Sequence, residues 1–190
     1  MRRSIFGHTM PTDKFLFDRI PTPIGEAEIV CDTQGRVRLF GWYERDEKWQ
    51  RHLNSQFGDA ELVPECDPFG LSSAIASYMQ GNVRAIDDLP VVFSGTAFQN
   101  KVWHALRTIP AGETLSYGAL ARQIGAPKAI RAVGLANGSN PIGVVVPCHR
   151  VIGSGGSLTG YGGGLERKKW LLAHEARYAG DGLFGMEMNR

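Results

Sequence analysis

The sequence predicts an α/β (α+β) chain of two domains, an α/β domain over residues 1–92 and a mainly helical domain over residues 93–177. In the first part, short apolar runs alternate with turn residues, which is typical of strands. In the second part, apolar residues recur at helical spacing between start and stop signals. Leu89-Pro90 and Ser94-Gly95 mark a linker between the two. Residues 178–190 are expected to form a tail without chemistry.

A β-meander is expected in the first part. Phe15–Phe17 precedes a turn at Pro21–Gly25, and the runs Glu26–Cys31 and Val37–Trp42 flank a turn at Asp32–Gly35. Apolar runs bounded by Gly, Pro and Asp are the usual signature of short strands joined by tight turns.

Helices are expected where capping residues precede periodic apolar positions. Thr96 and Gln99 have capping-box spacing, Ser116 can cap the next helix, and Pro127 suits the first turn of the one after it. The two short helices on either side of Gly125 form a helix-turn-helix. The expected helices cover Glu44–Phe57, Leu71–Met79, 96–109, Tyr117–Ile124, Pro127–Asn137 and Glu166–Arg177.

The segment Val144–Ile152 carries the most distinctive chemistry. Its three valines before Pro147 predict a buried strand that stops abruptly. Cys148 follows, beside His149 and Arg150, which favour the reactive thiolate form. Cys148 is therefore either a nucleophile or a small buried apolar residue. Because neighbouring strand residues point to opposite faces, His149 meets Cys148 only if the chain turns at Pro147 or a water bridges them.

Composition narrows the function classes. No apolar run is long enough for a membrane span and the N-terminus lacks a signal peptide, so we expect a cytoplasmic protein. Three widely spaced cysteines, Cys31, Cys66 and Cys148, argue against a disulfide framework or a zinc finger. Residues 98–150 hold six basic residues and one acidic residue, which predicts either a surface that faces a polyanion or an ordinary solvated face.

The second helix of the helix-turn-helix has an unusually flat side. Ala129, Ala132 and Gly134 are small, and Arg131 projects between them. Small residues allow close approach to a partner, and a single Arg can fill a gap in a base stack or pair with phosphate. The helix has few side chains for reading base edges, so we expect little sequence specificity. The alternative is an Ala-rich packing helix with a solvated Arg131.

Two further features come near the C-terminus. The glycine-rich loop 153–164 has neither a P-loop nor a dinucleotide pattern, so Tyr161 is expected either to close over a flat ligand or to lie in an ordinary turn. His174-Glu175 resembles half of a zinc motif, but Tyr178 stands where the second His belongs. Glu175 is instead a candidate to orient an imidazole, or else a solvent-exposed acid.

Taken together, the motifs follow one order. They are Thr96–Gln99, Val102-Trp103, Ile109–Thr114, Ser116–Gly118, Arg131–Gly134, Asn140-Pro141, Val146–Ile152, Gly160-Tyr161 and Leu171–Glu175. In this order they resemble the O6-alkylguanine-DNA alkyltransferase family, especially its bacterial members. The resemblance is dense over residues 93–176 and general over 15–90. It implies a ribonuclease-H-like N-terminal sheet with helices and a helical C-terminal domain with a helix-turn-helix.

The resemblance also implies roles for individual residues. Cys148 accepts the alkyl group of O6-alkylguanine, and also of O4-alkylthymine, in double-stranded DNA. His149 deprotonates it through a water, Glu175 orients His149, Asn140 braces the turn, and Tyr117 donates a proton toward the base. The implied substrate contacts are Tyr161, Val151 and Gly162, although Gly162 replaces a hydroxyl residue of some relatives. The implied DNA contacts are Arg131, Ala132, Gly134 and Ala129, in the minor groove, with Arg131 filling the stack vacated by a flipped base.

The predicted product is a thioether, which has no easy leaving group, so each molecule should act once. We expect no cofactor, no membrane partner and a monomer, with cooperativity on DNA left open. We expect no metal, because Cys31, Cys66, His8 and His52 form no convincing set. Three rival functions remain: a lesion-binding protein without catalysis, a thiol hydrolase that turns over esters or peptides, and a sequence-specific DNA regulator.

Overall fold

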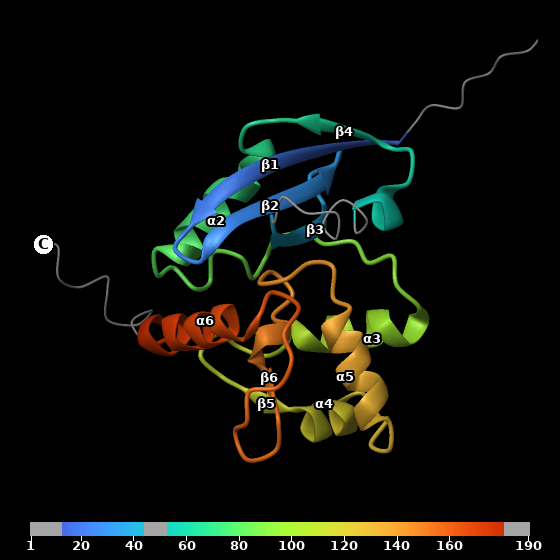
Figure 1. The fold of residues 1–190 in the computed structure, drawn as a ribbon, viewed down its shortest axis with the longest axis vertical. Helices are drawn as coiled ribbons and strands as arrows, with labels where there is room; N and C mark the ends of the chain where they lie inside the picture. The colour runs from blue at the N-terminus through green and yellow to red at the C-terminus, as the bar shows by residue number, and fades with distance from the viewer. Residues whose placement is uncertain (1–12, 44–52, 181–190) are drawn as a thin grey trace, which may run out of the picture.

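The computed structural model describes residues 13–43 and 53–180 of the chain. A sheet and the helical residues packed on it occupy the N-terminal half, and helices dominate the C-terminal half (Figure 1). The predicted mixed architecture, with the sheet first and the helices second, is therefore confirmed.

Four strands build the sheet in the order β3-β2-β1-β4. Strands β1 (Lys14–Thr22), β2 (Gly25–Asp32) and β3 (Val37–Trp42) form the predicted antiparallel meander. Strand β4 (Glu61–Pro64) was not predicted and pairs in parallel with β1. It is short and half of it is exposed, so its sequence lacks the apolar alternation that marks a strand.

Helix α2 (Leu71–Met79) has the predicted bounds and packs on β1, after a short 3-10 helix η1 (Pro68–Gly70). Its residues Ile75 and Tyr78 are fully buried in the main core, which also contains side chains of the helical half. Of the helix expected over Glu44–Phe57, residues 44–52 lie outside the described part of the chain, and residues 53–57 are helical.

Local capping signals place the helices of the second half. Helix α3 (Ala97–Leu106) has a complete capping box, in which Thr96 and Gln99 bond each other's backbone N–H. Ser116 caps α4 (Tyr117–Gln123) as predicted. Helix α6 (Leu165–Tyr178) lies where it was expected.

Helix α5 (Ile130–Gly138) starts three residues later than predicted. Pro127 was expected in its first turn, but residues 126–129 form a separate turn in which Ala129 N–H donates to Ala126 O. The helical ladder begins only when Val133 N–H reaches Ala129 O. Pro127 therefore belongs to the turn between the two helices.

The valine segment is buried, but the prediction of a strand was wrong. Val144 has a left-handed backbone with φ of 63°, which breaks an extended run. A single bridge joins Ile142 to Phe40 of β3, flanked by the bonds Phe40 N–H to Pro141 O and Gly143 N–H to Phe40 O. The segment therefore pairs with the edge of the sheet at Ile142 and turns away from it at Val144.

Two short elements follow the valines. Cys148–Arg150 form a 3-10 helix, η2, so the chain does turn at Pro147. Strand β6 (Val151–Ile152) then pairs in parallel with β5 (Leu115–Ser116). This pairing brings the start of α4 beside the end of η2.

The predicted linker is also more ordered than a free connection. Val37 N–H donates to Pro90 O at 2.7 Å, and Val92 N–H donates to Val37 O at 3.0 Å. The segment therefore lies against β3 and ties the helical half to the edge of the sheet.

Candidate active site

Cys148 lies at the wall of a cavity of about 740 Å³ between the sheet and the helical half. Its side chain is almost buried, with 5 % of the residue surface exposed. Burial raises the pKa of the thiol, while the Asn140 side chain and the Lys168 ammonium act in the opposite direction. The cavity walls include Phe40, Trp42, Trp103, Asn137, Asn140, Tyr161, Gly162, Gly163 and Arg167.

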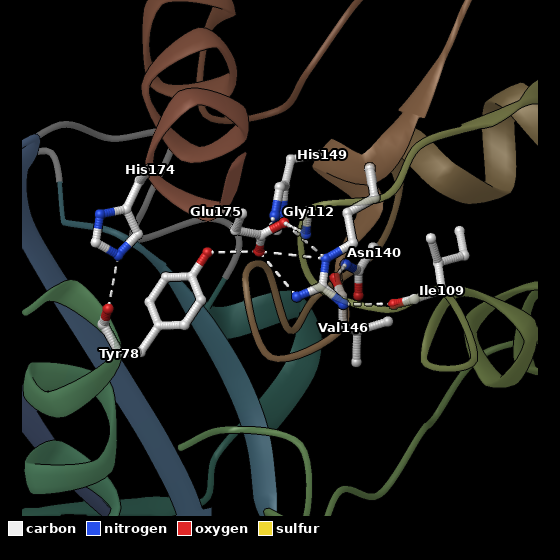
Figure 2. Close-up of polar contacts among 9 residues, drawn as sticks. Tyr78, Ile109, Gly112, Asn140, Val146, His149, His174 and Glu175 are labelled. Atoms are coloured by element: carbon white, nitrogen blue, oxygen red, sulfur yellow. Dashed lines mark hydrogen bonds and ion pairs between the residues drawn. The ribbon is translucent and has the colours of Figure 1, made fainter. Parts of the chain in front are cut away.

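The buried side chains of His149, Arg150 and Glu175 form one polar network (Figure 2). His149 Nε2 lies 2.9 Å from Glu175 Oε1. Arg150 grips both oxygens of the same carboxylate, with Nη2 at 2.8 Å from Oε1 and Nε at 3.0 Å from Oε2. Arg150 Nη1 also donates to Ile109 O at 2.5 Å. The structure therefore brings together His149 and Glu175, which the sequence separates by 26 positions.

The protonation of this network follows from its contacts. Burial would raise the pKa of Glu175, but hydrogen bonds from His149 and Arg150 and the positive charge of Arg150 hold it well below its usual range. Burial lowers the pKa of His149 despite the opposing effect of Glu175, so the imidazole is neutral at pH 7. Since an ionised carboxylate only accepts, Nε2 carries the proton and donates to Glu175. Nδ1 is then an acceptor, and it is buried with no partner among the described residues.

Asn140 holds the loop that leads to Cys148. Its Nδ2 donates to Val146 O at 2.7 Å, and its Oδ1 accepts from Ile142 N–H at 3.0 Å. Both ends of the amide are therefore used within the valine segment. Asn137 of α5 adds a bond from Nδ2 to Cys148 O at 3.3 Å. Together, the two amides fix the backbone on which the thiol sits.

Some of the residues predicted to contact or protonate the substrate line the cavity, and others do not. Tyr161 and Gly162 line the cavity with Cys148, and the Tyr161 ring lies edge-on to His149. Val151 does not line this cavity, because its side chain is fully buried in the core. Tyr117, at the start of α4, also lies outside the cavity wall and packs beside Gly134 of α5. The substrate contact of Val151 and the proton donation by Tyr117 remain predictions.

The predicted DNA contacts lie in α5 and in the residue before it. Arg131 and Ala132 are exposed, while Ala129 and Gly134 are half-buried. Leu135 is 77 % exposed on the same helix, which adds an apolar side chain to this surface. Arg131, Ala132 and Leu135 of α5 are therefore accessible to a partner.

Comparison with known proteins identifies the family. The sequence model described as "6-O-methylguanine DNA methyltransferase, DNA binding domain" matches residues 97–177. A methylated-DNA–protein-cysteine methyltransferase of Salmonella typhimurium is 49 % identical over 164 residues, which cover 85 % of this chain and 96 % of the relative. The chain belongs to the O6-methylguanine-DNA methyltransferase family.

Solved structures of the family have the same fold. The O6-methylguanine methyltransferase of Mycobacterium tuberculosis is 40 % identical and superposes with a TM-score of 0.72 over 86 % of this chain and 94 % of its own. The M. tuberculosis protein in complex with DNA is 39 % identical, with a TM-score of 0.67 over 87 % of this chain and 94 % of that one.

Three buried polar residues of the site have roles that the sequence did not indicate. Arg150 was noted only for its charge, yet it binds both oxygens of Glu175. Lys168 is fully buried in α6 and donates to Val151 O at 2.7 Å and Thr159 O at 3.0 Å, which ties β6 to the glycine loop. Tyr78 reaches Glu175 from the sheet half. An apolar residue was equally compatible with the helical pattern at positions 78 and 168, so no local signal marks them.

Within residues 13–43 and 53–180, no group of three or more His, Cys, Asp or Glu side chains is placed to hold a metal ion. In the same residues, no helix combines the length and the apolar character that a membrane span requires.

Proposed function

We propose that this family member repairs DNA by transferring the alkyl group of O6-alkylguanine to its own Cys148. The observation that carries the proposal is the position of Cys148 at the wall of a large cavity, next in the chain to His149, whose imidazole is bonded to the buried Glu175. Membership of the family supports DNA alkyl repair in general, and the arrangement of these side chains supports the particular acceptor.

The first step is the removal of the thiol proton. Burial alone opposes ionisation of Cys148, so the thiolate must form as the reaction proceeds. His149 presents Nδ1 as an acceptor, and its Nε2–H remains bonded to Glu175. Through a bridging water, Nδ1 takes the proton, and Glu175 stabilises the imidazolium that results.

The second step is a direct displacement. The sulfur forms a bond to the alkyl carbon, the bond from that carbon to O6 breaks, and its electron pair stays on the guanine. A proton must then reach the guanine ring; Tyr117 is the proposed donor, and its phenolate regains a proton from water. Asn140 and Asn137 hold the backbone of the nucleophile in place, which favours the in-line geometry that this displacement requires.

The thioether product explains why the protein is expected to act once. A carbon–sulfur bond to an alkyl group has no easy leaving group, and disulfide exchange cannot remove it. We therefore propose a stoichiometric reaction, with O4-alkylthymine as a second substrate. No step requires a cofactor.

Access to the target requires that the nucleotide leave the duplex. We propose that the exposed side of α5 enters the minor groove, where Ala129, Ala132 and Gly134 permit close approach. Arg131 would fill the gap left in the base stack. Phosphate contacts from the basic residues of this half would add affinity without sequence preference. In this proposal residues 1–92 and 93–177 act as two domains of one cytoplasmic monomer.

Intact-mass measurement tests the proposal. After incubation with a duplex that contains O6-methylguanine, the protein should gain the mass of one methyl group. C148S should gain none, and C66S should gain the methyl group as the wild type does, because Cys66 is exposed and outside the cavity. Methylation of C148S, or more than one turnover with excess duplex, would contradict the proposal. Hydrolysis of esters without dependence on the lesion would favour a thiol hydrolase instead.

A further inference from the structure

Glu175 is contacted from the sheet half of the protein as well as from the helical half. The Tyr78 hydroxyl, near the end of α2, donates to Glu175 Oε1 at 2.7 Å (Figure 2). Both side chains are fully buried, and the two residues lie 97 positions apart in the sequence. The contact therefore exists only when the two halves are packed together.

The same carboxylate oxygen serves His149. Oε1 lies 2.9 Å from His149 Nε2 and 2.8 Å from Arg150 Nη2, in addition to the Tyr78 hydroxyl. A carboxylate oxygen offers about two lone-pair sites, so these donors share its negative charge. The hydrogen bond from Tyr78 reduces the negative charge on Oε1, and this weakens the bond between His149 and Glu175.

Tyr78 is held at both ends. His174 Nε2 lies 2.7 Å from Tyr78 O, and since a carbonyl only accepts, the imidazole donates. His174 is itself stacked on Trp170, with ring centroids 4.7 Å apart. Burial, followed by the negative charge of Glu175, raises the pKa of Tyr78 well above its ordinary value, so its hydroxyl stays protonated and remains a donor.

We propose that Tyr78 is a positioning residue for alkyl transfer, whose hydroxyl fixes the Glu175 carboxylate and limits the negative charge available to His149. The proposal rests on the proposed function, because it concerns the base that activates Cys148. By sharing Oε1, Tyr78 keeps His149 neutral and able to accept the thiol proton. In this proposal, a residue of the sheet half influences the protonation of His149 directly, so that half does more than support the site.

Several charged or titratable groups surround the His149–Glu175 pair. Replacing Tyr78 by Phe removes one hydroxyl and changes none of the charges. A change in the protonation of His149 would therefore follow from the lost hydrogen bond. The surrounding groups are Tyr78 of α2, Cys148 and Arg150 of η2, Tyr161 of the glycine loop and Lys168 of α6, and His174 of α6 packs on the Tyr78 ring.

The test compares Y78F with the wild type in the full chain. The rate constant of methyl transfer from an O6-methylguanine duplex is measured against pH under single-turnover conditions, per folded protein. Without the hydroxyl, Glu175 attracts the His149 proton more strongly, so more of the base is protonated at a given pH. We expect transfer about ten-fold slower at neutral pH, with the acid limb of the profile moved to higher pH. Nitrogen NMR of the His149 ring should show its titration moving in the same direction.

A matched control is Y178F. The Tyr178 ring also packs on His174, with centroids 5.0 Å apart, but in the described part of the chain it has no hydrogen bond to Glu175. Its rate and profile should match those of the wild type. An unchanged rate and profile for Y78F would overturn the proposal. A uniform loss at every pH with an unmoved His149 titration would also overturn it, because it would indicate packing damage only. If the wild type gains no methyl group, the proposed function fails, and the NMR titration still tests Tyr78.

Discussion

Arg150 binds both carboxylate oxygens of Glu175, with Nη2 at 2.8 Å from Oε1 and Nε at 3.0 Å from Oε2, and neither side chain reaches solvent to a significant extent. The planar guanidinium matches the spacing of the two oxygens, which a Lys ammonium cannot do. Arg150 also donates to Ile109 O, so the same side chain joins η2, α6 and the loop after α3.

Removal of this guanidinium should destabilise the fold strongly. R150M leaves Glu175 as a buried charge with fewer donors, and we expect the free energy of unfolding to fall by about 3 kcal/mol or more. R150K keeps the charge but loses the bidentate contact with Glu175, so its free energy of unfolding should lie between those of R150M and the wild type. Urea unfolding measures the differences. The control is K169M, which breaks the exposed Lys169–Glu166 pair and should change stability by less than about 0.5 kcal/mol. Equal losses in K169M and R150M would contradict the interpretation.

His149 should make the stability fall as the pH drops from about 6.5 toward the lower pKa of its buried ring. Its pKa is lowered in the folded protein, while the unfolded chain has the ordinary value of about 6.5. As pH falls below that value, the unfolded state binds a proton that the folded state resists, so acid favours unfolding. The slope is at most about 1.4 kcal/mol per pH unit for one proton.

H149Q should flatten the dependence in this window, as measured by urea unfolding at several pH values. Titration of Glu175 does not contribute to the slope in this pH range. Its pKa is lowered by folding, so its stabilising contribution is present above about 4.3 and is lost only as pH falls further. A slope in H149Q equal to that of the wild type would show that other groups cause the effect.

Arg131 should matter for duplex DNA and not for the chemistry itself. It is exposed on α5, on the surface proposed to enter the minor groove. R131A should slow the repair of a lesion in a duplex by about ten-fold or more, because extrusion of the base loses the group that fills the stack. Its reaction with the free base O6-methylguanine should stay within about two-fold of the wild type. An equal loss on both substrates would contradict the stack-filling role.

Gly163 should be intolerant of a side chain. A Cβ at this position would overlap the Trp42 indole and would lie 2.7 Å from Tyr161 Cε1, and both rings line the cavity. We expect G163A to lose about 1–3 kcal/mol of stability through overpacking and to transfer methyl groups about ten-fold more slowly. G160A is the control in the same loop, because a Cβ there has no neighbour within 4 Å. Wild-type behaviour of G163A would show that the loop can move away from Trp42.

Local signals were sufficient for much of the fold. The meander of β1, β2 and β3, the bounds of α2, and the caps at Thr96 and Ser116 could all be predicted, because each depends on residues that are close in the sequence. Strand β4 could not, because its pairing with β1 joins Lys14 to Glu61 across a long separation. The valine run shows the same limit. Its apolar side chains predict burial, but whether a buried run becomes a strand depends on a free edge, and Phe40 offers Ile142 only a single bridge.

The candidate site divides in the same way. The sequence by itself determined which groups are present: a thiol, an imidazole and a guanidinium in one segment, a Glu in the last helix, and small residues around Arg131. Only the tertiary structure decided what these groups do to one another. A pKa or a tautomer depends on burial and on donors within about 3 Å. The donors to Glu175 come from α2, from η2 and from the loop after α3, and folding alone brings them to one carboxylate.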